Sequence, residues 1–225
     1  MVGHRDVESF AVSRSDGVDV IIRLLLESGI DHRSFRSILD FGCGCGRLLA
    51  GWEGVLGPDA RLYGCDINAD LVEFCQKNVK IAEVVKTGYY PPLPYADCQF
   101  DFLYSASVYT HLTDAAMLQW TGEIARILKP GGIAMITFHG GYYLSDLAKV
   151  SKLGAGLLSE NRYYVHLYSD PANTWKGSNE YATWFSADFM KRLFIGFDLV
   201  KMFPGLSHGP THFVSYQDVA VFRRC

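Results

Sequence analysis

Short apolar segments alternate with amphipathic segments over the first 139 residues of the chain. The apolar segments have the length and composition of buried strands, and the amphipathic ones have helical spacing. Helices are expected to begin at Asp16, Asn68 and Thr113, whose side chains can cap a helix. We predict strands at 36–41, 60–66, 81–85, 100–105 and 133–138. Repeated strand-to-helix alternation requires crossover connections, which place parallel strands in one sheet with helices on both faces. This pattern restricts the chain to the doubly wound α/β class.

The alternation stops after His139, and a short helix is possible near 144–153. It resumes at Ser186, where another helix is expected to begin. Two further strands are expected at 197–202 and 213–222, and the connection between them contains no helix. Strands joined in this way can pair antiparallel. The prediction is therefore a Rossmann-like sheet of seven strands, mostly parallel with an antiparallel last strand. Residues 1–225 are expected to form a single domain, with residues 140–183 as an insertion.

The composition excludes several other classes of protein. The chain has 225 residues, 49% of them hydrophobic and 20% charged, and a formal net charge of −3. It has no apolar run of about 20 residues, which a membrane span would need. A small negative net charge also does not favour binding to the phosphate backbone of nucleic acid. The first residues lack a secretory signal pattern, and the six cysteines lack metal-site spacing. We expect reduced thiols, a cytoplasmic location, and neither membrane, nucleic acid nor metal as partner; the oligomeric state stays open.

Three alternating glycines follow the first predicted strand. The segment at 40–47, Asp-Phe-Gly-Cys-Gly-Cys-Gly-Arg, leads directly into a helix, so its backbone can turn sharply and approach a ligand closely. The dinucleotide pattern G-x-G-x-x-G fails because Arg47 occupies the third glycine position, and no Lys-Ser or Lys-Thr follows. Asp66 ends the next strand, at the interval where an acidic residue binds ribose hydroxyls. The alternatives are that the glycine segment is only a tight turn that binds no ligand and that Asp66 is only a solvated residue at the end of a strand.

Four motifs in order resemble those of class I S-adenosylmethionine-dependent methyltransferases. Residues 38–46, Ile-Leu-Asp-Phe-Gly-Cys-Gly-Cys-Gly, resemble the first motif, hxDxGxGxG, and residues 63–66 resemble the acidic motif of the second strand. Residues 93–101, Leu-Pro-Tyr-Ala-Asp-Cys-Gln-Phe-Asp, are similar to the segment that leads into strand four. Residues 123–132, Glu-Ile-Ala-Arg-Ile-Leu-Lys-Pro-Gly-Gly, are similar to the stretch before strand five. The resemblance covers residues 36–139.

The resemblance implies S-adenosylmethionine as the cofactor. It implies that the first motif and the end of strand four hold the methionine part and that the acidic residue of strand two holds the ribose. Many members have an acidic residue after strand three for the adenine, and a tyrosine stands there in this chain. The cofactor residues implied in this way are Asp40, Gly42, Gly44, Gly46, Asp66, Ile67, Tyr89, Tyr90 and Ser105.

Methyl transfer from a sulfonium is an in-line displacement, which depends on alignment and exclusion of water more than on a covalent intermediate. A neutral oxygen acceptor must also lose a proton, and histidine is the side chain that titrates near pH 7. His111 follows the fourth strand and His139 ends the fifth, so both are expected at the ligand edge of the sheet. We predict these two as catalytic residues; a histidine that only bonds to the backbone is the alternative.

Tyrosine and tryptophan are concentrated in and beside the insertion at 140–183. Aromatic rings with polar tips suit a lid over an organic acceptor, and they offer π-electron density near a sulfonium. A hydrophobic cluster that only packs on the sheet is the alternative. The predicted substrate residues are Tyr142, Tyr143, Tyr164, Trp175 and Trp184.

These observations together predict a methyltransferase that uses S-adenosylmethionine and acts on a small organic acceptor. O-methylation of a natural product or a saccharide is the expected reaction. The alternatives are N- or C-methylation, a non-catalytic subunit that binds the cofactor, and a nucleotide-linked oxidoreductase, against which the failed dinucleotide pattern counts.

Overall fold

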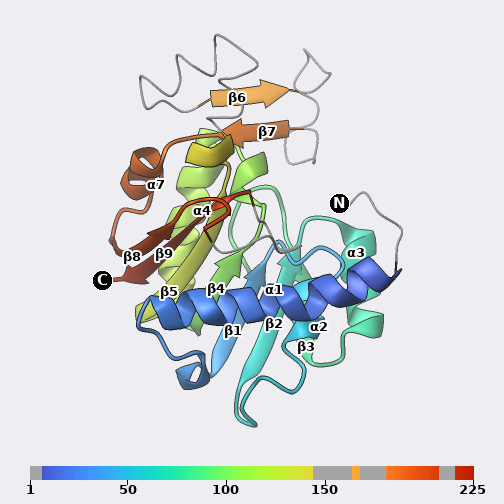
Figure 1. Cartoon of the computed structure of the whole chain (residues 1–225). Coiled ribbons are helices and arrows are strands. Elements are labelled where there is room, and N and C mark those ends of the chain that lie inside the picture. Colours follow the sequence, from blue (N-terminus) through green and yellow to red (C-terminus); the bar gives the residue numbers. More distant parts are fainter. Residues whose placement is uncertain (1–6, 144–163, 168–180, 208–215) are drawn as a thin grey trace.

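Seven strands form one mixed sheet in the computed structural model, which describes residues 7–143, 164–167, 181–207 and 216–225 (Figure 1). The strand order is β3-β2-β1-β4-β5-β9-β8. The first five strands pair in parallel, whereas β9 runs antiparallel to both β5 and β8. The predicted fold class is therefore confirmed. The strands are β1 Ser37–Phe41, β2 Arg61–Asp66, β3 Ala82–Lys86, β4 Phe100–Ser105, β5 Leu128–Phe138, β8 Phe197–Phe203 and β9 Asp218–Arg224.

The strand order reverses between β1 and β4. From β1 the chain adds β2 and β3 on one side, and it then crosses back to place β4 on the other side of β1. Open α/β sheets bind their ligands at this switch point, outside the carboxyl ends of the strands. The glycine loop at 42–46 leaves β1 here, and Ser105 is the last residue of β4 beside it.

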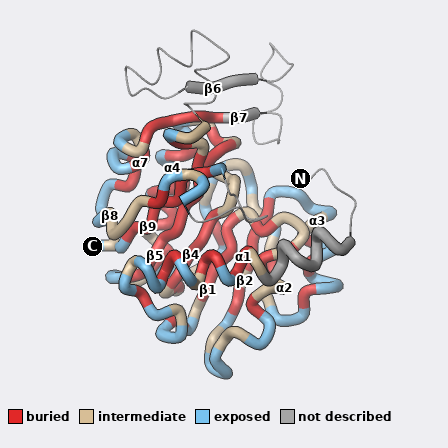
Figure 2. Tube along the Cα trace, in the orientation of Figure 1, coloured by how far each residue is buried: buried red, intermediate tan, exposed pale blue. Residues whose placement is uncertain are grey.

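Helices cover both faces of the sheet because successive strand side chains point to opposite faces. Ile38 of β1 belongs to a buried cluster with residues of α1, α2 and α3, whereas the next residue, Leu39, belongs to a second cluster with α4 and α7. Figure 1 shows α1 crossing one face of the sheet, and Figure 2 shows the buried residues running through its strands. The helices are α1 Val7–Glu27, α2 Arg47–Gly51, α3 Ala69–Asn78, α4 Asp114–Ile127 and α7 Ala187–Leu193.

Three helices begin at the residues that the sequence predicts. Asn68, Thr113 and Ser186 each accept a hydrogen bond from a backbone N–H of the first turn, which satisfies donors that the helix itself cannot pair. The prediction for Asp16 is wrong, because α1 begins at Val7 and Asp16 lies inside it. The polar residue types that cap a helix also occur within one, so the pattern by itself did not fix this boundary.

A two-stranded sheet stands apart from the main one, in the segment where the sequence predicted no strand. Strand β6 (Tyr164–Leu167) pairs antiparallel with β7 (Tyr181–Trp184), and Figure 1 shows this hairpin beyond the end of the main sheet. An isolated parallel bridge between His139 and Trp184 joins β7 to the end of β5. The short helix predicted near 144–153 lies outside the described residues.

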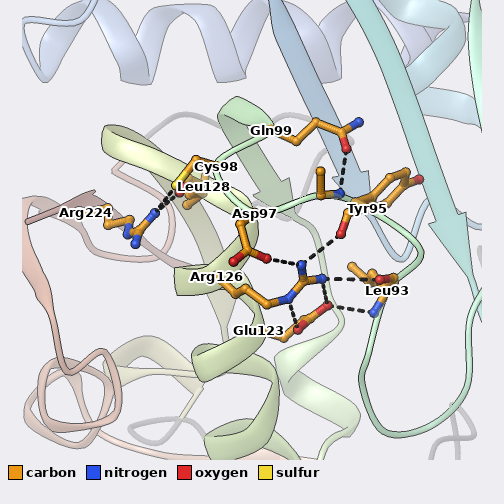
Figure 3. A network of polar contacts seen from close by, with 10 residues as sticks. Leu93, Tyr95, Asp97, Cys98, Gln99, Glu123, Arg126, Leu128 and Arg224 are labelled. Atoms are coloured by element: carbon orange, nitrogen blue, oxygen red, sulfur yellow. Dashed lines mark hydrogen bonds and ion pairs between the residues drawn. The ribbon is translucent and has the colours of Figure 1, made fainter.

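A polar network connects two of the motifs that the sequence singled out (Figure 3). Arg126 of α4 forms paired bonds with Glu123, binds Asp97 at 2.7 Å, and donates to the carbonyl groups of Leu93 and Tyr95. Glu123 in turn accepts the N–H of Leu93 at 2.7 Å. The network therefore fixes the segment 93–97 against α4, so these motif residues stabilise the fold.

Three further findings bear on function. None of the helices among the described residues is long and apolar enough to cross a membrane. The same residues contain no group of three or more His, Cys, Asp or Glu side chains that could hold a metal ion. All six cysteines are free thiols, as predicted.

Candidate active site

The glycine loop is tied by backbone hydrogen bonds to the end of β2. The N–H groups of Gly42 and Cys43 both donate to the carbonyl of Cys65, at 2.8 and 2.9 Å. Gly42, Gly44 and Gly46 all have positive φ angles, of 83°, 55° and 76°, which glycine adopts without strain. A Cβ at Gly42 would lie 2.1 Å from a methyl group of Val108, whereas one at Gly44 would meet nothing within 4 Å. The loop is thus packed on one side at Gly42 and open at Gly44.

Asp66 fixes the loop from the adjacent strand. Its carboxylate accepts the N–H of Gly44 at 2.7 Å and the N–H of Asn68 at 2.8 Å. A carboxylate offers about four lone-pair positions, so two remain for a ligand. The alternative of a solvated aspartate without a structural role is therefore wrong.

Asp40 is a buried carboxyl group with an unused oxygen. Its side chain is 1% exposed, and Oδ2 has no hydrogen-bond partner in the part of the chain that the structure describes. The pKa of Asp40 is raised to about 8, mainly by burial, which a hydrogen bond from Tyr104 partly opposes and the nearby Asp66 reinforces. Trp52 Nε1 donates to the Tyr104 hydroxyl at 3.1 Å, which orients it. A buried carboxyl group without a partner is costly unless a ligand supplies one.

Ser105 presents a second unused polar atom at the same edge. The register of β1 and β4 pairs Asp40 with Tyr104, which places Ser105 one residue further toward the carboxyl end. Its side chain is buried, and Oγ has no partner among the described residues. Because successive side chains of a strand alternate, Ser105 points to the opposite face of the sheet from Asp40 and Tyr104. Asp40 and Ser105 therefore each offer a ligand one unused oxygen at this edge.

The tyrosines implied for adenine binding differ in their environment. The Tyr89 hydroxyl accepts the N–H of Thr113 at 3.3 Å, and its carbonyl accepts from Trp120 Nε1 at 2.9 Å, so Tyr89 is held against α4. Tyr90 packs edge-on against Tyr89 and is 46% exposed. Ile67, directly after β2, is 42% exposed. Tyr90 and Ile67 therefore offer exposed apolar surface, whereas Tyr89 supports the loop.

His139 lies between two aromatic rings at the end of β5. Its ring centroid is 4.4 Å from that of Tyr143 and 5.5 Å from that of Trp184. The side chain donates to the backbone of Thr183, and Nδ1 is buried without a partner among the described residues. Nε2 therefore holds the proton, and Nδ1 keeps a lone pair. Burial, together with the charge of His111, lowers the pKa of His139 to about 4, so the ring is neutral at pH 7.

The structure brings the two predicted histidines to one edge of the sheet. His111 ends a short 3₁₀ helix, Tyr109–His111, after β4, and its N–H donates to the carbonyl of Val108. It is close enough to His139 to affect the pKa of that residue. Both therefore lie beside the loops that follow β4 and β5, as the sequence predicts.

The predicted substrate residues are only partly described. Trp175 lies outside the described residues, and Tyr164 is described only as the first residue of β6, opposite Trp184. Tyr142 and Tyr143 follow the end of β5, and their rings contact each other with centroids 6.3 Å apart. The structure thus brings three of the five together: Tyr142, Tyr143 and Trp184.

A segment just before β9 contributes to this site and was not predicted. The Tyr216 ring stacks on Tyr142, with centroids 5.5 Å apart and planes 23° apart. Gln217 accepts from Thr137 at 2.6 Å and donates to Ser107 at 2.7 Å, which connects β5 to the loop after β4. No local pattern marks these residues, because their partners are far away in the sequence. Hereafter Tyr142, Tyr143, Trp184 and Tyr216 are called the aromatic wall.

Comparisons with known proteins agree with this geometry. Residues 38–132 match the family described as a methyltransferase domain. A tRNA (carboxymethyluridine(34)-5-O)-methyltransferase from Arabidopsis thaliana is 35% identical over a stretch that covers 44% of this chain and 23% of that protein. A demethylmenaquinone methyltransferase from Bacillus mycoides is 26% identical over 73% of each chain. The structure of an S-adenosylmethionine-dependent methyltransferase from Methanosarcina mazei has a TM-score of 0.65 at 18% identity, covering 88% of this chain and 96% of that one, which shows the fold.

Fold, motifs and comparisons define one class of protein. Residues 38–132 match the methyltransferase domain family, and the chain has the fold of solved S-adenosylmethionine-dependent methyltransferases. The unused atoms of Asp40 and Ser105 and the open side of the loop at Gly44 fit S-adenosylmethionine as the cofactor. The chain spans less than a third of the first curated relatives that it matches, 23% and 30% of their lengths.

Proposed function

We propose that the protein transfers the methyl group of S-adenosylmethionine to a hydroxyl oxygen of a small, uncharged acceptor that contains a ring. The observation that carries the proposal is the state of His139, a neutral histidine with an unused ring nitrogen between aromatic rings. It belongs to the same sheet edge as Asp40 and Ser105. When bound, the cofactor supplies an electrophilic methyl group on a sulfonium.

The cofactor is held in this proposal by residues of three strand ends. The Asp40 carboxylate accepts from the ammonium group of the methionine part, the Ser105 hydroxyl lines that part from β4, and Asp66 accepts from the ribose hydroxyls with its remaining lone pairs. Tyr90 and Ile67 offer the apolar surface for the adenine. Burial of the Asp40 oxygen makes this contact strong, because no water competes for it.

His139 orients the acceptor and receives its proton. Nδ1 accepts the hydrogen bond of the acceptor hydroxyl and so directs an oxygen lone pair toward the methyl group. As the new carbon–oxygen bond forms, the hydroxyl proton becomes strongly acidic, so even a histidine with a lowered pKa can take it. His111, which is partly exposed, can pass that proton to solvent. Alignment and exclusion of water supply the remaining acceleration.

The aromatic wall indicates the class of acceptor. Its four members offer ring faces and hydroxyl tips, and none has a charged side chain, which suits an uncharged ring more than a phosphorylated compound. The names of the relatives range from a tRNA to a demethylmenaquinone methyltransferase, so the acceptor class rests on the wall and not on them. Residues 140–183 form the acceptor lid in this proposal.

Methyl transfer from labelled S-adenosylmethionine tests the proposal directly. The purified protein is incubated with a panel of phenols, ring alcohols, amines and bulk tRNA, and the position of the label is found by NMR and mass spectrometry. Transfer to an oxygen of a ring compound is expected, and the Asp40→Ala variant should transfer none. Label on nitrogen, carbon or RNA, or cofactor binding without transfer to any member of the panel, would contradict the proposal.

A further inference from the structure

Three consecutive residues at the start of β9, Tyr216, Gln217 and Asp218, tie together loops that are far apart in the sequence. Tyr216 stacks on Tyr142, and Gln217 bonds to Ser107 and Thr137. The third residue, Asp218, is 5% exposed, and it bonds to the loops that follow β5 and β8. The segment 216–218 is therefore the point at which three loop ends of the acceptor side meet.

Asp218 holds two of these loops by their backbone. Its Oδ2 accepts the N–H of Gly141 at 2.9 Å, and its Oδ1 accepts the N–H of Gly205 at 2.8 Å. A Cβ at Gly140 would lie 2.2 Å from Oδ2, so the carboxylate occupies the space that a side chain would need. Charge-assisted bonds to two N–H groups from one buried carboxylate give a rigid connection.

The bond to Gly141 determines where the following residues lie. Tyr142 comes next and stacks on Tyr216, and Tyr143 packs on the ring of His139. The loop at Gly205 closes the other side, because a Cβ there would lie 2.9 Å from the Cβ of Tyr142. Asp218 thus holds the backbone directly before Tyr142 and Tyr143, whose rings pack on Tyr216 and His139.

We infer that Asp218 is a positioning residue that holds the aromatic wall over His139, and that Tyr216 contacts the acceptor. The inference rests on the proposed function, because the wall has a role only if an acceptor binds there. Both carboxylate oxygens are needed, since each one accepts from a different loop. Asparagine at this position would turn an N–H₂ group toward one of the two N–H donors, so one loop would lose its bond.

The pKa of His139 tests this inference without an acceptor. The full chain is saturated with S-adenosylhomocysteine, the histidine signals are titrated by NMR, and the His139 signal is identified by its absence in His139→Phe. In Asp218→Asn the pKa should rise by about one unit or more, because water reaches the ring once Tyr143 moves away. Burial is the largest cause of the lowered pKa of His139, and the other two, His111 and the Thr183 backbone, are not altered by the substitution.

Asp101→Asn is the matched control. The Asp101 carboxylate also accepts two backbone N–H groups, from Arg36 and Ser37 at 2.8 and 2.9 Å, but at the opposite end of β1. This variant should leave the pKa of His139 unchanged. Asp218→Asn should bind S-adenosylhomocysteine within about twofold of the wild type by calorimetry, since the cofactor residues lie elsewhere. An unchanged His139 pKa in Asp218→Asn overturns the inference, whereas failure of the wild type to bind the cofactor product overturns the proposed function.

Two neighbouring glycines give a second, independent pair of variants. Gly140→Ala places its Cβ against the Asp218 carboxylate, whereas a Cβ at Gly141 would lie at an ordinary 3.8 Å from it. Only Gly140→Ala should raise the pKa of His139. Equal shifts in both variants, or none in either, would show that Asp218 does not control the wall.

Discussion

Cofactor binding should depend steeply on pH through Asp40. The ammonium group of the ligand requires the carboxylate, but burial raises the pKa of Asp40 to about 8, so the group is mostly protonated at neutral pH. With that value about 1% is ionised at pH 6 and about half at pH 8. Affinity should therefore rise about 50-fold between these pH values, or about 2 kcal/mol, and it is lost as the pH falls.

Calorimetry with S-adenosylhomocysteine measures this effect, because its amino group stays protonated over the same range and the compound is stable. Titrations at pH 6, 7 and 8 in buffers of different ionisation enthalpy should show release of nearly one proton at pH 6 and 7. Asp40→Asn cannot ionise, so its affinity should be lower at pH 8 and almost independent of pH. Asp101→Asn should retain the dependence of the wild type. Affinity that is flat from pH 6 to 8 in the wild type, without proton release, refutes the reasoning.

Three further predictions concern the loop, the ribose and stability. Gly42→Ala should destabilise the fold more than Gly44→Ala in thermal unfolding, because both have positive φ but only Gly42 meets a methyl group at 2.1 Å; equal losses would contradict the packing argument. Asp66→Ala should weaken S-adenosylhomocysteine binding by about 1–3 kcal/mol, and unchanged affinity would remove it from the ribose site. The pKa of His139 is lowered to about 4 in the folded state, so the neutral ring favours folding. Its contribution to the free energy of unfolding is complete above pH 6.5 and is lost as the pH falls toward 4. Urea unfolding of the wild type and His139→Phe should therefore differ by about 2 kcal/mol more at pH 7 than at pH 5, and a constant difference would refute the shift.

The strands of the main sheet were predictable because local composition determines them. β4 begins and ends where its apolar run does, at Phe100 and Ser105. The same holds for the cofactor loop, since the alternating glycines and Asp66 follow two such runs directly. The start of α1 was not predictable, because Asp16 fits a cap and a helix interior equally well.

The acceptor side depends on contacts that sequence spacing does not encode. Asp218 meets Gly141 across 77 residues, and Gln217 meets Ser107 across 110. Hairpin β6–β7 was missed for a similar reason, because its four-residue strands are short and its place is set by the bridge between His139 and Trp184. An aromatic run favours an acceptor lid without specifying which rings meet.

The residues of the cofactor side and those of the acceptor side lie in different parts of the sequence. The cofactor loop, Asp66 and the network of Arg126 with Glu123 are contained in residues 38–132, the part that matches the methyltransferase domain family. The segment 216–218 and all four residues of the aromatic wall lie outside it. Substitutions in 216–218 can therefore move the wall without touching a cofactor contact, because Asp218 bonds to the loops at Gly141 and Gly205, which lie outside that part. A change of acceptor at constant cofactor affinity should be possible through these three residues alone, and Tyr216 is the position where it should begin.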